Sequence, residues 1–152
     1  MTARLSLLLS FAGLLVSGYL TYAHFNADAL VCAESALIDC AAVTSSEQSK
    51  LFGIPVALLG LLFFAAMTVL CLPRVFRVEK LRWVRLGAVG VGVLMVVYLV
   101  AAELLLIGKI CLWCTVVHVL TLVLAGLLVS GALRPSSLEP PLPDSRPPGV
   151  PR

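Results

Sequence analysis

The sequence predicts an all-α integral membrane protein: a four-transmembrane-helix bundle with an outer capping loop that contains a short helix. Three observations support this fold class. The chain is 61% hydrophobic and only 12% charged, it holds four long apolar stretches, and a polar connector separates the first two. A soluble domain of 152 residues has too little interior to bury so much apolar surface, so lipid must surround most of the chain.

Four stretches approach the length of about 20 mainly apolar residues that a transmembrane helix needs. They are residues 5–23, 54–72, 86–108 and 110–133. The third contains one acid, Glu103, and the fourth contains one ionisable residue, His118. Because backbone groups in lipid must bond within their own segment, these stretches predict a helical transmembrane domain over residues 1–133.

The first stretch also has features of a cleaved signal peptide. Arg4 supplies a short positive end, and Ala27, Asp28 and Ala29 resemble a small-residue cleavage site. The apolar run is longer than the roughly 7–15 residues of a signal core. This length favours a retained membrane helix.

Charge predicts the orientation. The connector 73–85 is strongly basic, whereas the connector 26–53 is acidic with Lys50 as its one base. With four spans, the connector 73–85 lies on the same side as both termini. That side holds every Lys and Arg except Lys50 and Lys109. By the positive-inside rule this side is the cytoplasm, and the net charge of +3 requires no nucleic acid.

The last segment, residues 134–152, is rich in proline and has no apolar periodicity. Such a composition cannot bury enough apolar surface to fold. We therefore expect a disordered cytoplasmic tail.

The predicted orientation brings four of the five cysteines to the outer face. Cys32 and Cys40 lie in the first outer loop, while Cys111 and Cys114 lie at the outer end of the fourth span. That compartment permits disulfides. Cys71 lies at the inner end of the second span, where it is expected to be a small apolar residue.

Four cysteines on one face allow a zinc site, two static disulfides or a redox relay. The first pair, in "CAESALIDC", is spaced more widely than zinc knuckles require, so no metal is predicted. A Cys-x-x-Cys pair at a helix start has redox geometry, because first-turn amides and Lys109 would stabilise a thiolate at Cys111. A non-catalytic scaffold stapled by disulfides remains the alternative of another class.

A redox pair at the hydrocarbon boundary needs an electron acceptor. A lipid-soluble quinone takes up two electrons and two protons, which is what one dithiol releases. The mouth between the helices at the outer face would be its pocket.

Several motifs occur in a characteristic order. The first span ends in "SGYLTYAHF", the loop and second span contain "CAESALIDCAAVTSSEQSKLFGIPVALLG", and the fourth span opens with "CLWCTVVH". With these motifs the chain resembles the vitamin K epoxide reductase family in its bacterial form, over roughly residues 10–125.

The resemblance implies a four-helix bundle around a quinone and a role for each outer cysteine. Cys111 and Cys114 would be the active-site pair, with Cys114 facing the quinone. Cys32 and Cys40 would be the shuttle pair, and Cys40 would attack Cys111 through a mixed disulfide. Ser46 matches the family's loop serine and would orient the cap over the quinone-binding pocket.

The resemblance further implies a membrane thiol–quinone oxidoreductase. Like DsbB, it would reoxidise a secreted thioredoxin-fold partner, pass two electrons to menaquinone or ubiquinone, and so support disulfide bond formation. The partner is expected to be a separate protein. The location would be the bacterial plasma membrane, with the cysteines on the extracytoplasmic face. The alternative within the family is a vitamin K epoxide or quinone reductase that supplies quinol.

Two ionisable residues within the spans are further candidates. His118 lies one turn deeper than Cys114, where it would bind a quinone oxygen, although a histidine bonded to a neighbouring helix is an equal alternative. Glu103 lies at a similar depth and is a candidate proton relay that could pair with His118 or Lys109. A partly solvated interfacial glutamate is the alternative.

Two local expectations concern the outer interface. Trp113 is expected to be an interfacial anchor, as is Trp83 at the inner boundary. Residues 45–52 are expected to form a small interfacial helix, because Ser45 or Ser46 supplies capping chemistry.

Overall fold

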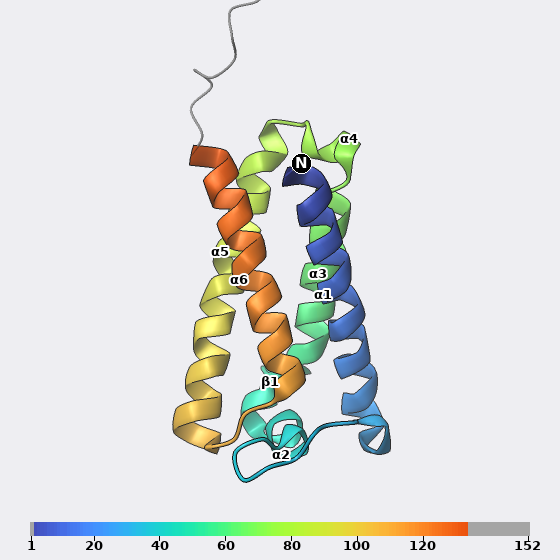
Figure 1. Cartoon of the computed structure of the whole chain (residues 1–152), viewed down its shortest axis with the longest axis vertical. Helices are drawn as coiled ribbons and strands as arrows, with labels where there is room; N and C mark the ends of the chain where they lie inside the picture. Colours follow the sequence, from blue (N-terminus) through green and yellow to red (C-terminus); the bar gives the residue numbers. More distant parts are fainter. Residues whose placement is uncertain (1, 134–152) are drawn as a thin grey trace, which may run out of the picture.

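The structure, a computed structural model, describes residues 2–133, so the predicted tail lies outside the described residues. Four helices stand side by side as a bundle (Figure 1). They are α1 (Thr2–Phe25), α3 (Val56–Leu70), α5 (Lys80–Ala101) and α6 (Leu112–Leu133). α5 continues as η3 (Ala102–Ile107), one stretch of π-helix. α1 packs against α3 and α6, and α5 packs against the same two helices, so the four close into a ring.

Three of these helices are long and apolar enough to cross a membrane: α1, α5 with η3 (Lys80–Ile107), and α6. α3 has 15 residues, which at about 1.5 Å per residue give roughly 22 Å, against about 30 Å of hydrocarbon. The predicted second span at 54–72 is therefore not confirmed by helix length, and the four-span count stays a prediction.

Arg85 explains where α3 ends. Its buried guanidinium donates hydrogen bonds to the carbonyls of Leu70 (3.4 Å) and Phe76 (3.1 Å) and lies 4.3 Å from the centre of the Phe76 ring. The last carbonyls of a helix need such partners, and a cation there also faces the negative end of the helix dipole. The short helix α4 (Pro73–Phe76) then turns the chain toward α5.

α1 and α3 approach closely because small residues line the contact. The buried positions Ser6, Ser10, Gly13 and Ser17 recur at spacings of three and four along α1. At Gly13 the ring of Phe64 occupies the space where a Cβ atom would lie. In lipid, helices associate through such close packing, since there is no hydrophobic gain from burying one apolar side chain against another.

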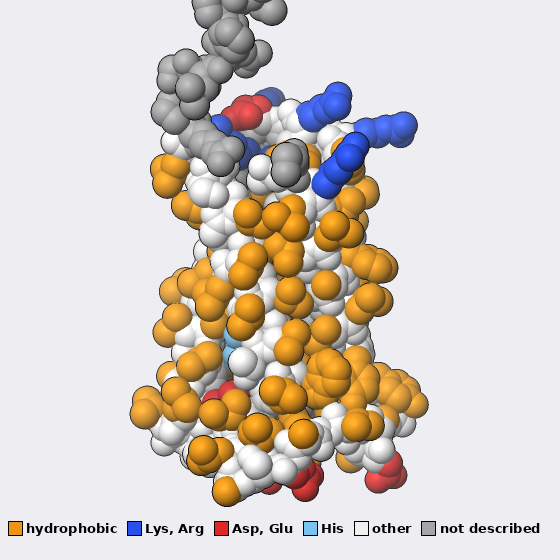
Figure 2. Space-filling view, in the orientation of Figure 1, with side chains coloured by type: hydrophobic (Ala, Val, Ile, Leu, Met, Phe, Trp, Pro, Cys, Tyr) orange, Lys and Arg blue, Asp and Glu red, His pale blue; other side chains and the backbone are white. Residues whose placement is uncertain are grey.

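Hydrophobic side chains cover the middle of the molecule (Figure 2). On the face shown, Lys and Arg gather at the end where the N-terminus lies, and acidic side chains appear at the end that carries α2 (Cys40–Ser45). A belt of exposed apolar side chains is what a surface facing lipid requires. The separation of charge matches the asymmetry of the sequence.

The prediction of a helix at residues 45–52 in the loop between α1 and α3 was wrong. The short α-helix of this loop is α2, which begins at Cys40 because the Asp39 carboxylate accepts the Ala42 N–H at 2.8 Å. Ser46 ends α2 and then caps the 3₁₀ turn η2 (Glu47–Ser49). The remaining elements are the turn η1 (Ala27–Ala29) and the two-stranded hairpin of β1 (Lys50–Leu51) and β2 (Ile54–Pro55).

We expect Gly13→Ala to lower the free energy of unfolding in detergent by about 1–3 kcal/mol, because the added methyl group displaces the buried Phe64 ring. Gly126→Ala is the matched control, since no atom lies within 4 Å of its added Cβ. Thermal or denaturant unfolding of both variants measures the difference. Equal effects at the two glycines would contradict the close packing of α1 and α3.

Candidate functional site

The outer loop is joined to the α5–α6 connector by backbone hydrogen bonds. Asp39 N–H donates to Ile110 O at 3.1 Å, and Ile110 N–H donates to Leu37 O at 2.9 Å. Ile38 and Ile110 thus form an isolated parallel bridge. Because Cys40 follows Asp39 and Cys111 follows Ile110, this bridge brings the loop pair and the Cys-x-x-Cys pair to the same place.

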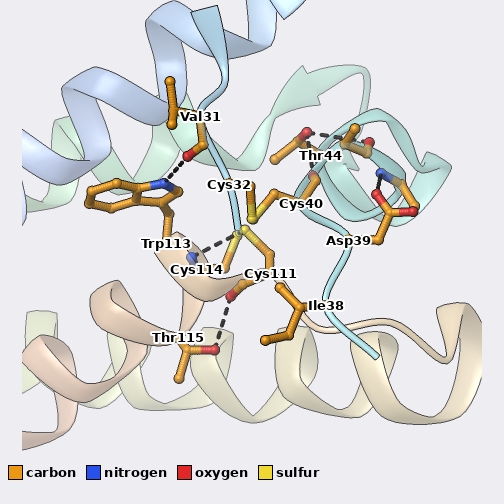
Figure 3. The surroundings of a disulfide bond; sticks show 12 residues. Val31, Cys32, Ile38, Asp39, Cys40, Thr44, Cys111, Trp113, Cys114 and Thr115 are labelled. Atoms are coloured by element: carbon orange, nitrogen blue, oxygen red, sulfur yellow. Dashed lines mark hydrogen bonds between the residues drawn. A yellow bond between two sulfur atoms is a disulfide. The ribbon is translucent and has the colours of Figure 1, made fainter. Parts of the chain in front are cut away.

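Cys32, Cys40, Cys111 and Cys114 meet there in one cluster (Figure 3). Cys32 and Cys40 form a disulfide with their Cα atoms 6.2 Å apart, while Cys111 and Cys114 are free thiols. Cys40 and Cys111 are fully buried in one apolar cluster, and Cys32 and Cys114 pack against it. The two pairs are therefore in contact within one desolvated site.

Cys111 lies in the connector just before α6, outside the membrane-spanning helix. The backbone N–H of Cys114 donates to its sulfur at 3.3 Å. Hydrogen bonds from Cys114, first from its side chain and then from its backbone, lower the pKa of the Cys111 thiol, although burial acts in the opposite direction. The expected help from Lys109 is not seen, because its ammonium group donates to Ala36 O at 2.8 Å.

A cavity of about 370 Å³ lies among the helices beneath the loop. Cys114 lines it, together with the other three predicted site residues, Ser46, Glu103 and His118. Most of the remaining lining is apolar and comes from α1, α3, α5 and α6. Of the four outer cysteines, Cys114 is the one that lines this cavity.

Glu103 and His118 are both buried in the walls of the cavity. Glu103 belongs to η3, and its carboxyl group lies near the backbone N–H of Cys111. No ion pair joins Glu103 to His118 or Lys109 in the part of the chain that the structure describes. π-helical turns are frequent at functional sites because they shift side chains out of the regular helical register.

Ser46 connects the two short helical elements of the loop. Its hydroxyl donates to Val43 O at 2.7 Å and accepts the Ser49 N–H at 3.2 Å. The residue thus shapes the loop and lines the cavity at once. Its predicted role in orienting the cap is compatible with this position.

Sequence reasoning missed how two aromatic residues hold the loop. Trp113 Nε1 donates to Val31 O at 2.8 Å, and the Tyr19 hydroxyl bonds to both Ala29 O and Val31 N. An interfacial aromatic residue predicts only an anchor to lipid headgroups. The partners here are backbone groups, which leave no mark in the sequence.

Together, the apolar bundle and its four clustered cysteines define a membrane redox protein with one disulfide and one free dithiol beside an apolar cavity. Residues 4–129 match the profile of the vitamin K epoxide reductase family, and the chain belongs to that family. Its members are quinone-linked oxidoreductases. No curated protein sequence matches the chain.

With the Cys32–Cys40 disulfide closed and Cys111 and Cys114 reduced, we expect the Cys111 thiolate to form at a lower pH than that of an ordinary cysteine, whose pKa is about 8.5. Cys114→Ala removes the S–H donor and should raise this midpoint, whereas Cys114→Ser retains a donor and should move it less. Thiolate absorbance against pH measures the midpoint, with Cys111→Ser as the blank. An unchanged midpoint in Cys114→Ala would show that the hydrogen bond does not control the pKa.

Proposed function

We propose that the protein is a thiol–quinone oxidoreductase that reoxidises a thioredoxin-fold partner and passes two electrons to a membrane quinone. The observation that carries this proposal is the placement of the active pair. Cys114 lines the apolar cavity, while Cys111 packs with the Cys32–Cys40 disulfide on the other side. The dithiol thus lies between a disulfide and an apolar cavity.

Electrons enter at Cys32, which is partly exposed whereas Cys40 is fully buried. A thiolate of the reduced partner attacks Cys32, which breaks the Cys32–Cys40 bond and releases the Cys40 thiolate. The second thiol of the partner then displaces Cys32. The partner leaves as a disulfide, and the shuttle pair is a dithiol.

The second transfer takes place inside the cluster. The Cys40 thiolate attacks Cys111 of the oxidised active pair, forming a Cys40–Cys111 bond and releasing Cys114 as a thiolate. Cys32 then attacks Cys40, restores the shuttle disulfide and frees Cys111. The result is a Cys32–Cys40 disulfide and a Cys111/Cys114 dithiol, which is the distribution found in the structure.

The cavity fits the ring of a quinone such as menaquinone or ubiquinone. Its volume is that of a small-molecule pocket, and its mainly apolar lining includes the polar residues Ser46, Glu103 and His118 as well as Cys114. A quinone bound there supplies a two-electron, two-proton acceptor. His118 would donate a hydrogen bond to a ring oxygen, Ser46 would hold the loop over the cavity, and Glu103 would take up a proton released by the dithiol.

The proposal includes an orientation. The end that carries α2 and the cysteines would face the extracytoplasmic side of a bacterial plasma membrane, and both termini would be cytoplasmic. The basic connector between α3 and α5 supports this through the positive-inside rule. α3 would then also span the membrane, as the shortest of four spans. The residues that flank it would contact the lipid interface.

Cys114→Ala tests the proposed function directly. Given reduced thioredoxin-fold protein and quinone, this variant should form no quinol, and Cys32 and Cys40 should accumulate as thiols, because Cys111 without Cys114 cannot form the disulfide that Cys40 attacks. Non-reducing mass spectrometry and quinol absorbance measure the two outcomes. Cys71→Ala is the matched control and should retain quinol formation, since Cys71 lies buried at the opposite end, beside Ser10. Quinol formation by Cys114→Ala would refute the assignment.

Glu103→Gln keeps the shape of the side chain but cannot accept a proton. We expect quinol formation to fall at least about tenfold, as is typical when a positioned proton acceptor is removed, while the partner is still oxidised in a single turnover. Glu79→Gln is the control, because Glu79 lies on the surface in a salt bridge with Arg82. Unchanged quinol formation in Glu103→Gln would remove the proton-relay role.

A further inference from the structure

The segment that carries Cys32, residues 29–32, is held by two side chains from the helices. The Tyr19 hydroxyl donates to Ala29 O at 3.1 Å and accepts the Val31 N–H at 2.8 Å. The Trp113 indole N–H donates to Val31 O at 2.8 Å (Figure 3). Both backbone polar groups of Val31 are thus bound from α1 and α6.

These two side chains also support each other. The Tyr19 and Trp113 rings meet edge to face, with their centroids 5.1 Å apart. Val31 itself is 75% exposed, so its side chain contributes little to holding the segment. The backbone bonds to Tyr19 and Trp113, here called the aromatic latch, therefore fix this part of the loop.

The latch and the Ile110 bridge hold different cysteines. Cys40 follows Asp39, whose N–H is bonded to Ile110, so its position survives when the shuttle disulfide opens. Cys32 is tied to Cys40 by that disulfide and by packing against the same apolar cluster, and it is tied to the helices through Val31. Once the disulfide is broken, the latch adds directed hydrogen bonds to this packing and keeps Cys32 beside Cys40.

We propose that Tyr19 and Trp113 are positioning residues that hold Cys32 in place for its attack on the Cys40–Cys111 bond. This inference rests on the proposed relay. In that step the Cys32 thiolate forms a bond to Cys40, the Cys40–Cys111 bond breaks, and Cys111 leaves as a thiolate. Trp113 lies between Cys111 and Cys114 in the sequence. Its indole therefore fixes Cys32 relative to the turn that carries the pair accepting the electrons.

The direction of the Trp113 N–H separates this role from simple membrane anchoring. An anchoring tryptophan keeps its N–H at the headgroups, whereas this one is bonded to the loop backbone. Trp83 provides the comparison, because it is 68% exposed at the opposite end of the bundle. Trp83→Phe is therefore the matched control for Trp113→Phe.

The experiment measures partner-driven quinol formation and the disulfides that accumulate. Trp113→Phe keeps an aromatic ring but loses the N–H, and Tyr19→Phe loses only the hydroxyl. Trp113→Phe should slow turnover about fivefold, the effect of one hydrogen bond, and Tyr19→Phe, which loses two, should slow it at least as much. Each should accumulate the Cys40–Cys111 disulfide. Trp83→Phe should do neither. Unchanged turnover in both latch variants would overturn the proposal.

A second arm isolates the active pair. In a Cys32→Ala/Cys40→Ala background, a small dithiol can drive quinol formation only by reducing Cys111–Cys114 directly. Adding Trp113→Phe to this background should leave the rate unchanged. A fivefold fall here would mean that Trp113 acts on the active pair and not on Cys32, which overturns the proposal.

A third measurement does not depend on the relay. With the shuttle disulfide reduced, hydrogen exchange at the Val31 amide, whose N–H donates to Tyr19, should be faster in both Tyr19→Phe and Trp113→Phe than in Trp83→Phe. Equal exchange would disprove the latch even if the wild type made no quinol. Absence of quinol from the wild type together with faster exchange would refute the proposed function while retaining the latch.

Discussion

The short backbone bridge between the loop and Ile110 determines the rest of the site. Each of its hydrogen bonds contributes only about 1 kcal/mol net, because water could satisfy the same groups. Their effect is to align the loop with the α5–α6 connector. The N–H of Asp39 is bound to Ile110 of the connector, while the Asp39 carboxylate caps the start of α2. Cys40 is therefore placed at a helix start directly beside Cys111, where a loop without the bridge would leave it free to move.

Much of the bundle could be predicted from the sequence, because long apolar stretches can be satisfied in lipid only by helices. The length of α3 could not be predicted in this way. Its stretch is apolar throughout, but the hairpin takes up Ile54 and Pro55, and the buried Arg85 closes the helix at Leu70. The loop helix was misplaced for a similar reason. Asp39, Ser45 and Ser46 can all cap a helix, and the tertiary bridge to Ile110 selected Asp39.

At the site, helical spacing predicted that His118 lies one turn after Cys114, and both line the cavity. Glu103, a candidate from its depth, and Ser46, a candidate from the family resemblance, line it as well. Prediction failed where a polar side chain had several partners within reach. Lys109 was expected beside the thiolate but donates to Ala36 O, and the partners of Trp113 and Tyr19 are backbone groups whose position depends on the folded loop. Sequence reveals residue chemistry more readily than it reveals such contacts.

The proposed relay would need one fixed sulfur, Cys40, and one that is held more weakly, Cys32. Cys40 would have to meet Cys111 from a constant direction, which buried packing and the backbone bridge provide. Cys32 would bond in turn with an external protein and with Cys40, so it would have to be accessible and able to move. Side-chain hydrogen bonds to an exposed segment suit that need, because such segments open locally at a small free-energy cost while the core stays folded. The aromatic latch then limits how far Cys32 moves, and the buried bridge ensures that Cys40 does not move with it.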